Sequence, residues 1–491
     1  MQNAERLERI GATASQGADA DWDQVTAGNT ALRGFGNVLW YPTAGPQIFL
    51  GQGADLFQAI GRAKLANEQV SMHLRLTIEY QSDPPVAVYF CGRRQPLRAL
   101  PDDPDAPVAT GSGVATADFP AQLLGFRIPN LFLFDHAEAL IAPLPIASST
   151  SSSSSSAPTN NLEPTGAPML AAETRDDGSL PRLAASAEAI ASLLEHWFGA
   201  PPLSALTVLD HIGQPFEDGP FLVAPISTLA ASDASSALAH SMTHAWVETG
   251  QPWMDEGLAQ FAALLWVEQA QGRDRAIAEL NDLLQPLILS EPIVPERTAQ
   301  PATTPLPAPT GQPLIAANDE LYTRRKAVAV WFMLRGIVGE DALRETLAAW
   351  RMQPPSHAGA RDQALALEKL LEQTSNKDLA WFFHDWVLND QGLPDLSISD
   401  VTIRDLSGDQ LHKTGWLVSV TARNGGGAAA EVPIIIRSGT FTSTRRLLIP
   451  AYGLATDRVL VEAAPTQVLL NDGTTPEVRT PLHQRDIVIK P

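Results

Sequence analysis

Two histidines four residues apart are the side chains of this sequence best suited to bind a metal ion. They are His240 and His244, in the stretch AHSMTH. Residues at this spacing lie on one face of a helix, so both imidazoles can reach one Zn²⁺ ion at about 2.0–2.1 Å. Glu256 opens a second helix, with eleven residues between it and His244. Its carboxylate can supply a third ligand, which leaves the fourth position for water.

The surroundings of Glu256 and a later tyrosine carry a family resemblance. Glu256 stands in the stretch DEGLA, and Tyr322 stands in LYTRRKA. With the two histidines, these stretches resemble the gluzincin metallopeptidases, in particular the membrane alanyl aminopeptidase (aminopeptidase N) family, from about residue 170 onward. The resemblance implies one zinc ion held by His240, His244 and Glu256, and a peptide or protein as substrate or ligand. It also implies that Tyr322 stabilises the oxyanion of a tetrahedral intermediate.

The catalytic base of that family is missing from this chain. Gluzincins carry HExxH, in which the glutamate takes a proton from the zinc-bound water. Here Ser241 occupies that position, and a serine hydroxyl does not act as a base at neutral pH. Glu248 lies one turn too far along the helix to replace it, and Asp255 should point about 100° away from Glu256. The sequence therefore predicts a peptidase scaffold without its usual catalytic glutamate.

The segment that anchors a substrate's amino group in the family also differs. The family motif there is GxMEN, in an edge strand upstream of the ligand helix. The corresponding stretch of this chain, Gly219–Val223, reads GPFLV and has neither Glu nor Asn. Arg325 replaces the glycine that follows the family's Tyr-x-Lys, and the loop from His244 to Glu256 is shorter than in the aminopeptidases. The resemblance therefore does not extend to aminopeptidase specificity.

Three functional hypotheses follow from these residues. The first, which we favour, is a pseudoenzyme that binds zinc and peptides in the old active-site cleft, because losing a general base costs ~10²–10⁴ in rate. The second is an active zinc-dependent peptidase, endo- rather than aminopeptidase, that uses a non-standard base. The third is a structural or adhesion protein in which the two histidines bind no metal.

Helical periodicity surrounds the candidate site. The ligand helix is expected to begin at an N-cap, Asp233, and to end by Gly250. The second helix should run from Pro252 to about Gln271. Residues 286–313 are dense in proline and are expected to form a long loop.

Strand periodicity dominates both ends of the chain. Residues 71–80 alternate apolar and polar side chains, as a half-buried antiparallel strand does, and Leu131–Phe134 is a further short strand. A nearly pure serine stretch at 148–156 is typical of a flexible linker. After Pro394, five short strands with glycine-rich turns indicate a β-sandwich of immunoglobulin-like character.

The expected fold class is therefore multidomain α+β. The sequence predicts an N-terminal antiparallel β domain at 1–147 and a Ser/Pro-rich linker at 148–167. It then predicts a gluzincin-like (thermolysin-like) catalytic domain with a helical lobe at 168–396 and the β-sandwich at 397–491.

Composition narrows the classes of partner. A formal net charge of −21 argues against nucleic acid and anionic membrane surfaces. One cysteine, Cys91, excludes internal disulfides and a cysteine-rich zinc site. No apolar run approaches the ~20 residues of a membrane span, and the first residues lack the apolar core of a signal peptide. We therefore expect a soluble protein, either cytoplasmic or a mature exported form.

Overall fold

A computed structural model of the chain forms two compact units, residues 1–250 and 251–491, which are described separately below. The multidomain α+β class predicted from the sequence is confirmed. The structure describes the following residues: 24–25, 29–34, 40–41, 55–81, 83–100, 108–135, 139–141, 178–200, 202–211, 215–290, 311–353, 358–406, 415–479 and 483–489.

The first unit contains the strands that the alternating patterns predict. β3 (Ser71–Tyr80) has the expected bounds, and its exposure alternates residue by residue. β8 (Leu131–Phe134) is also as expected, and β10 spans Leu206–Leu209. The other strands are β1 (Gln24–Val25), β2 (Asn29–Leu32), β4 (Ala87–Phe90), β5 (Arg93–Arg94), β6 (Arg98–Ala99), β7 (Gly113–Leu123), β9 (Ala139–Ile141), β11 (Phe216–Glu217) and β12 (Phe221–Val223).

The described strands of this unit pair into three sheets. Their strand orders are β1-β2-β8-β4-β5, β3-β7-β6 and β11-β12-β10-β9. In the third sheet β9 pairs antiparallel with β10, so strands on either side of the serine-rich stretch share one sheet. That stretch itself lies outside the described residues, and the domain boundaries at 147 and 167 stay predictions.

The hairpin between β4 and β5 explains an unusual backbone conformation at the one cysteine. Cys91 and Gly92 form its two-residue turn, with φ of 47° and 71°. Positive φ at both central residues is the type I′ geometry that matches the twist of paired strands. Cys91 is 2% exposed. Burial, helped by the nearby charge of Asp218, raises the pKa of its thiol to about 12.

We therefore expect Cys91 to be inert to thiol reagents in the folded protein. At pH 8 a thiol with this pKa forms about 10³-fold less thiolate than a free cysteine does, and burial also blocks access. A disulfide-exchange reagent should label one thiol per chain in urea and none in buffer over the same time. Equal labelling rates in urea and in buffer would contradict this expectation.

The helices of the first unit are α1 (Asp55–Ala66), α2 (Ser179–Phe198), α3 (Ile226–Leu229) and α4 (Ser235–Trp246). The prediction that Asp233 caps the ligand helix is wrong. Asp233 lies in a 3-10 turn, η3 (Ser232–Ala234), and α4 begins directly after it with no side-chain cap. The 3-10 turn leads the chain into the helix, so no separate capping side chain is used. α4 also ends at Trp246, four residues before Gly250.

The helices of the second unit begin with α5 (Pro252–Gln271), which has the expected bounds. α6 (Arg273–Ser290) continues through Pro286, so the prediction of a loop is wrong for residues 286–290, and residues 291–310 lie outside the described residues. Leu280, Leu284 and Leu287 are fully buried and offset the cost of a proline inside a helix. The remaining elements are η4 (Leu314–Ala316), the π-helical turn η5 (Leu321–Lys326), α7 (Ala327–Val338), α8 (Glu340–Arg351), α9 (Ala360–Ser375), α10 (Ala380–Phe383) and the π-helical turn η6 (His384–Leu388).

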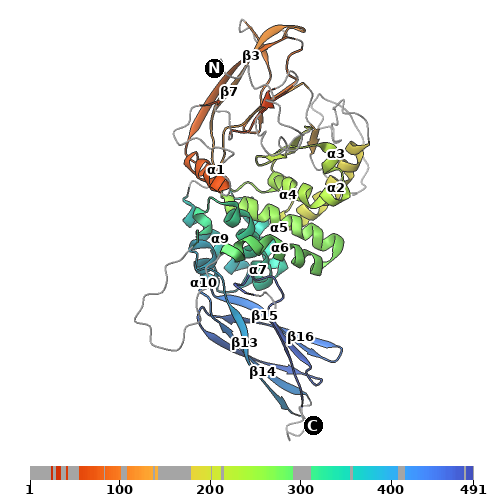
Figure 1. Cartoon of the computed structure of the whole chain (residues 1–491), viewed down its shortest axis with the longest axis vertical. Helices are drawn as coiled ribbons and strands as arrows, with labels where there is room; N and C mark the ends of the chain where they lie inside the picture. Colours follow the sequence, from red (N-terminus) through yellow and green to blue (C-terminus); the bar gives the residue numbers. More distant parts are fainter. Residues whose placement is uncertain are drawn as a thin grey trace, which may run out of the picture. The chain divides into compact units, whose positions relative to one another are not determined.

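Two antiparallel sheets complete the second unit, with β13 to β16 grouped together in Figure 1. Their orders are β13-β14-β17 and β16-β15-β18-β19. One hydrophobic core contains residues of both sheets, including Val420 of one and Ile434 of the other. The five expected strands are present, and their immunoglobulin-like character stays a prediction. The bounds are β13 (Leu396–Asp405), β14 (Trp416–Asn424), β15 (Ala430–Ser438), β16 (Phe441–Ile449), β17 (Leu454–Val461), β18 (Gln467–Leu470) and β19 (His483–Asp486).

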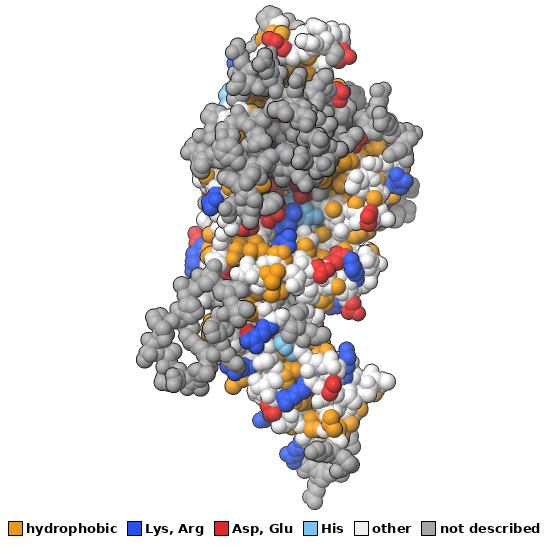
Figure 2. Space-filling view, in the orientation of Figure 1, with side chains coloured by type: hydrophobic (Ala, Val, Ile, Leu, Met, Phe, Trp, Pro, Cys, Tyr) orange, Lys and Arg blue, Asp and Glu red, His pale blue; other side chains and the backbone are white. Residues whose placement is uncertain are grey.

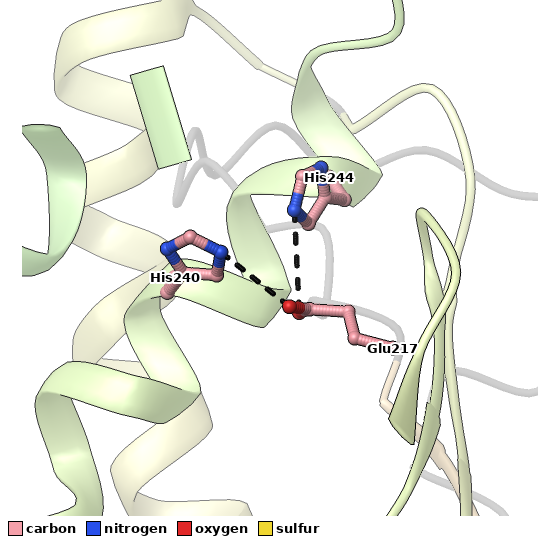
Figure 3. A group of neighbouring side chains, drawn as sticks. All are labelled: Glu217, His240 and His244. Atoms are coloured by element: carbon pink, nitrogen blue, oxygen red, sulfur yellow. Dashed lines mark ion pairs between the residues drawn. The ribbon is translucent and has the colours of Figure 1, made fainter. Parts of the chain in front are cut away.

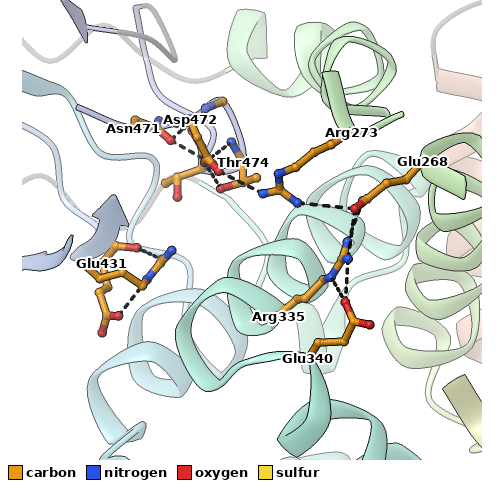
Figure 4. A network of polar contacts seen from close by, with 11 residues as sticks. Glu268, Arg273, Arg335, Glu340, Glu431, Asn471, Asp472 and Thr474 are labelled. Atoms are coloured by element: carbon orange, nitrogen blue, oxygen red, sulfur yellow. Dashed lines mark hydrogen bonds and ion pairs between the residues drawn. The ribbon is translucent and has the colours of Figure 1, made fainter. Parts of the chain in front are cut away.

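Charged side chains connect the helices of the second unit with the loop after β18 (Figure 4). Arg335 of α7 pairs with Glu268 of α5 at 2.6 Å. Arg273, at the start of α6, donates to Asp472 at 3.0 Å. Burial alone would raise the pKa of Asp472, but hydrogen bonds from Thr474 and Arg273 outweigh it and lower that pKa below 3.8.

The lowered pKa of Asp472 gives a pH-dependent contribution to stability. A carboxylate with a depressed folded-state pKa stabilises the fold above its unfolded pKa, and this is lost as the pH falls through the folded value. We expect Arg273→Met to lower the free energy of unfolding by about 1 kcal/mol at pH 7, because the ion pair is partly exposed. The difference from wild type should shrink below pH 4. Denaturation curves at both pH values test this, and an unchanged difference would contradict it.

Charged side chains are spread over the surface of the molecule. Figure 2 shows acidic and basic side chains interspersed over the face in view, with hydrophobic side chains between them. Among the described helices, none combines the length and the apolarity that crossing a bilayer requires.

Candidate metal centre

The two predicted histidine ligands lie together on α4. His240 and His244 are one turn apart, their ring centroids are 5.3 Å apart, and the ring planes cross at 75°. Both side chains are buried, at 8% and 4% exposure. The spacing of four residues places them on one helix face, as the sequence predicts. Every residue of α4 from Leu238 to Trp246 is buried, so the rings sit in a well-packed environment.

A carboxylate that sequence reasoning missed lies against this pair. Glu217, at the end of β11, has one oxygen 3.4 Å from the Nε2 atom of His240. Its other oxygen is 4.0 Å from the Nε2 atom of His244. Figure 3 shows both imidazoles on successive turns of α4, facing the carboxylate that reaches them from the neighbouring hairpin. These three residues offer ligand atoms that all lie within 4.8 Å of one another.

The donor set fits a zinc-type ion. Two imidazole nitrogens and a carboxylate oxygen are the ligands of many three-residue zinc sites. Ligand atoms bound tetrahedrally at about 2.0–2.1 Å lie about 3.3–3.4 Å from one another. The separation of 3.4 Å between Glu217 and His240 matches this value, and the separation of 4.0 Å between Glu217 and His244 is larger than it. The same residues can also form an ion pair when an imidazole is protonated.

Ser241 lies between the two histidines in sequence and is 5% exposed. Because α4 carries both histidines, Ser241 lies on this helix at the position predicted for the missing base. Its hydroxyl can donate and accept hydrogen bonds, but it does not hold a negative charge near pH 7. The described part of this helix supplies imidazoles for a metal ion and no carboxylate of its own.

The other two predicted site residues belong to the second unit. Glu256 lies in the first turns of α5, and its carboxylate accepts two hydrogen bonds from Arg324, at 3.2 and 3.0 Å. Tyr322 lies in the π-helical turn η5, is 9% exposed, and has the ammonium of Lys326 5.9 Å from its ring centre. The ligand role of Glu256 and the oxyanion role of Tyr322 stay predictions.

Glu217 was missed because no spacing rule connects it with the histidines. It stands 23 residues before His240, in a stretch read only as a turn and an edge-like strand. The comparison with the family's edge-strand motif began at Gly219, two residues after the carboxylate. The sequence feature that could have indicated Glu217 is an acidic residue in a strand upstream of the helix that carries the two histidines.

Comparisons with known proteins find only a distant structural similarity. No protein-family model matches it, and no curated protein matches it. Among solved structures, it is similar to a crystal structure of Legionella pneumophila aminopeptidase A in complex with aspartic acid, with a TM-score of 0.46 and 12% sequence identity. The match covers 80% of this chain and 42% of the other, so the chain spans less than half of that protein's length. Fold and site together define a multidomain α+β protein with a buried cluster of two histidines and a glutamate.

Proposed function

We propose that this protein is a zinc-binding, peptidase-like protein that binds peptides and whose hydrolytic activity is impaired. The observation that carries the proposal is the convergence of two buried histidines, His240 and His244, with a half-buried carboxylate. The resemblance of the stretches around Glu256 and Tyr322 to gluzincin peptidases supports the peptide as ligand. The proposed architecture is an N-terminal β domain, a gluzincin-like domain and an immunoglobulin-like sandwich.

The division of roles in this proposal follows from the side chains. The imidazoles of His240 and His244, both neutral, hold the ion together with a carboxylate. A zinc ion bound there supplies Lewis acidity toward a peptide carbonyl. The oxyanion-stabilising role of Tyr322 is proposed on the family resemblance alone. Ser241 cannot take the proton that peptide hydrolysis must remove from water, so a bound peptide is held and is not cut at an appreciable rate.

Zinc content after purification tests the proposal. We expect about one zinc per chain in wild type. His240→Ala and His244→Ala should each lower zinc affinity by more than the about 10–100-fold that loss of an outer-sphere partner costs. His73→Ala is the matched control, because His73 is a histidine on β3 that pairs with Asp118 at the surface.

Two outcomes would contradict the proposal. The first is wild type without zinc after dialysis against a zinc-buffered solution. The second is His240→Ala and His73→Ala retaining equal zinc. Isothermal calorimetry with a mixed peptide library, with and without zinc, then tests whether peptides bind to the loaded protein.

A further inference from the structure

We infer that β3 pairs with β3 of a second copy of this chain, antiparallel and with the two strands centred on Thr77. Such a dimer is independent of the metal ion and so goes beyond the proposed function. It concerns the first unit alone, where β3 is an outer strand of the sheet β3-β7-β6, and Figure 1 shows β3 and β7 as two long strands side by side. Among the described strands only β7 pairs with β3, so the backbone groups along the other edge of β3 can pair with another chain.

The backbone groups on that outer edge belong to the odd-numbered residues of β3. In an antiparallel pair, successive residues direct their N–H and C=O groups alternately toward the partner strand and away from it. The N–H of Leu124 donates to the carbonyl of Val70 at 2.8 Å, so the even-numbered residues face β7. The one register shift of the pair puts its extra residue in β7, which leaves the alternation along β3 unbroken. Arg75, Thr77 and Glu79 therefore direct their backbone groups to the outer edge.

The side chains of β3 differ in the same alternating way. The odd-numbered side chains are exposed, and they are Ser71, His73, Arg75, Thr77 and Glu79. The even-numbered apolar side chains pack against a hydrophobic core but are only half-buried, and they are Met72, Leu74, Leu76 and Ile78. A further strand along the outer edge would cover the open side of this apolar row and remove it from water.

The charges on the exposed face of β3 match those of a second copy in this register. With Thr77 opposite Thr77 of the second copy, Arg75 of each chain lies opposite Glu79 of the other. The same register places Leu76 opposite Ile78, so the apolar row also continues across the contact. Opposite charges that face each other across an antiparallel pair stabilise it, and like charges destabilise it. Centring the pair on Arg75 or on Glu79 would place like charges opposite each other.

Charged side chains on an edge strand usually prevent pairing with another chain, and the arrangement on β3 removes that obstacle. Arg75 donates two hydrogen bonds to Asp118 of β7, at 3.0 and 2.7 Å. A guanidinium has five N–H groups, so Arg75 can hold Asp118 and the second copy's Glu79 together. The dimer therefore adds two ion pairs without breaking the one within each chain.

The small size of the contact sets the expected affinity. Stable interfaces bury about 1,200–2,000 Å² in total, and weak, transient ones bury less. Two strand edges that pair over about five residues each belong to the weak class. We expect a monomer–dimer equilibrium with a Kd on the order of 10–100 µM.

Sedimentation velocity of the full chain tests the dimer. We expect the average mass to rise with concentration above the 52.6 kDa of one chain. Glu79→Lys and Arg75→Glu each place two pairs of like charges across the contact, so each should raise the Kd by about 10-fold or more. Glu188→Lys is the matched control, because it makes the same charge change at an exposed glutamate of α2 and should leave the Kd unchanged.

An equimolar mixture of the two charge variants separates a lost contact from a damaged fold. In a mixed pair, position 75 of each chain faces a position 79 of opposite charge. We therefore expect Glu79→Lys and Arg75→Glu to dimerise together with about the affinity of wild type, although neither does so alone. Mixing does not repair a misfolded chain, and melting temperatures of the separate variants check their folding.

Three outcomes would overturn the inference. The first is wild type that stays a monomer up to about 500 µM, well above the expected Kd. The second is a dimer that Glu79→Lys leaves unchanged, because its contact would then lie elsewhere. The third is a pair of stably folded variants that do not dimerise when mixed. None of these results depends on zinc, so the proposed function is tested separately.

Discussion

Replacing Ser241 with glutamate should create peptide hydrolysis in the pseudoenzyme that we propose. The change restores the HExxH arrangement between His240 and His244. Because a positioned general base contributes about 10²–10⁴ to the rate, we expect turnover of a mixed peptide library to rise by that factor over wild type. The measurement is release of new amino termini, with zinc content determined on the same samples.

Ser241→Gln is the matched control for that variant. It has the size and polarity of the glutamate without the ability to accept a proton, so its turnover should stay at the level of wild type. Ser241 is buried, and melting temperatures of both variants must show that the larger side chain is accommodated. Zinc-dependent turnover by wild type would show that another base operates and would favour the active-peptidase hypothesis. A folded, zinc-loaded Ser241→Glu variant that cuts nothing would show that the scaffold lacks more than its base.

Lys326→Met should destabilise the second unit by about 3–5 kcal/mol. The ammonium of Lys326 lies 2.6 Å from Asp390, and both side chains are completely buried. The same Asp390 oxygen accepts the backbone N–H of Gly392 at 2.9 Å. Removing the lysine leaves a buried carboxylate without its counter-charge, which is among the most costly single changes in a protein interior. Urea denaturation followed by tryptophan fluorescence measures the loss.

The double variant Lys326→Met with Asp390→Leu separates the two contributions to that loss. It removes both charges and fills similar volume with apolar groups, and such replacements are often neutral. We therefore expect the double variant to be clearly more stable than Lys326→Met alone. An exposed ion pair contributes up to about 1 kcal/mol. If the free energy of unfolding of Lys326→Met were within that range of the wild-type value, the role assigned to this ion pair would be contradicted.

Much of the fold was predictable because its signals are local. The alternation in residues 71–80 predicts β3 with correct bounds, and helical periodicity predicts α5 to Gln271. The side-chain direction in these elements depends only on the backbone repeat, so the pattern of neighbouring residues is enough to predict it. Errors occurred where local signals compete: Pro286 indicated a break, but packing of α6 kept it helical.

By itself, the sequence determined the pair of histidines on one helix face, because a spacing of four residues depends only on the geometry of one helix. It also determined that Ser241, and not a glutamate, follows the first of these histidines. The tertiary structure alone decided which carboxylate meets the histidines in the first unit. Glu217 reaches them through the pairing of β11 with β12, and Glu256 reaches Arg324 across 68 residues. Contacts between distant segments arise from packing of whole elements, which no local spacing encodes.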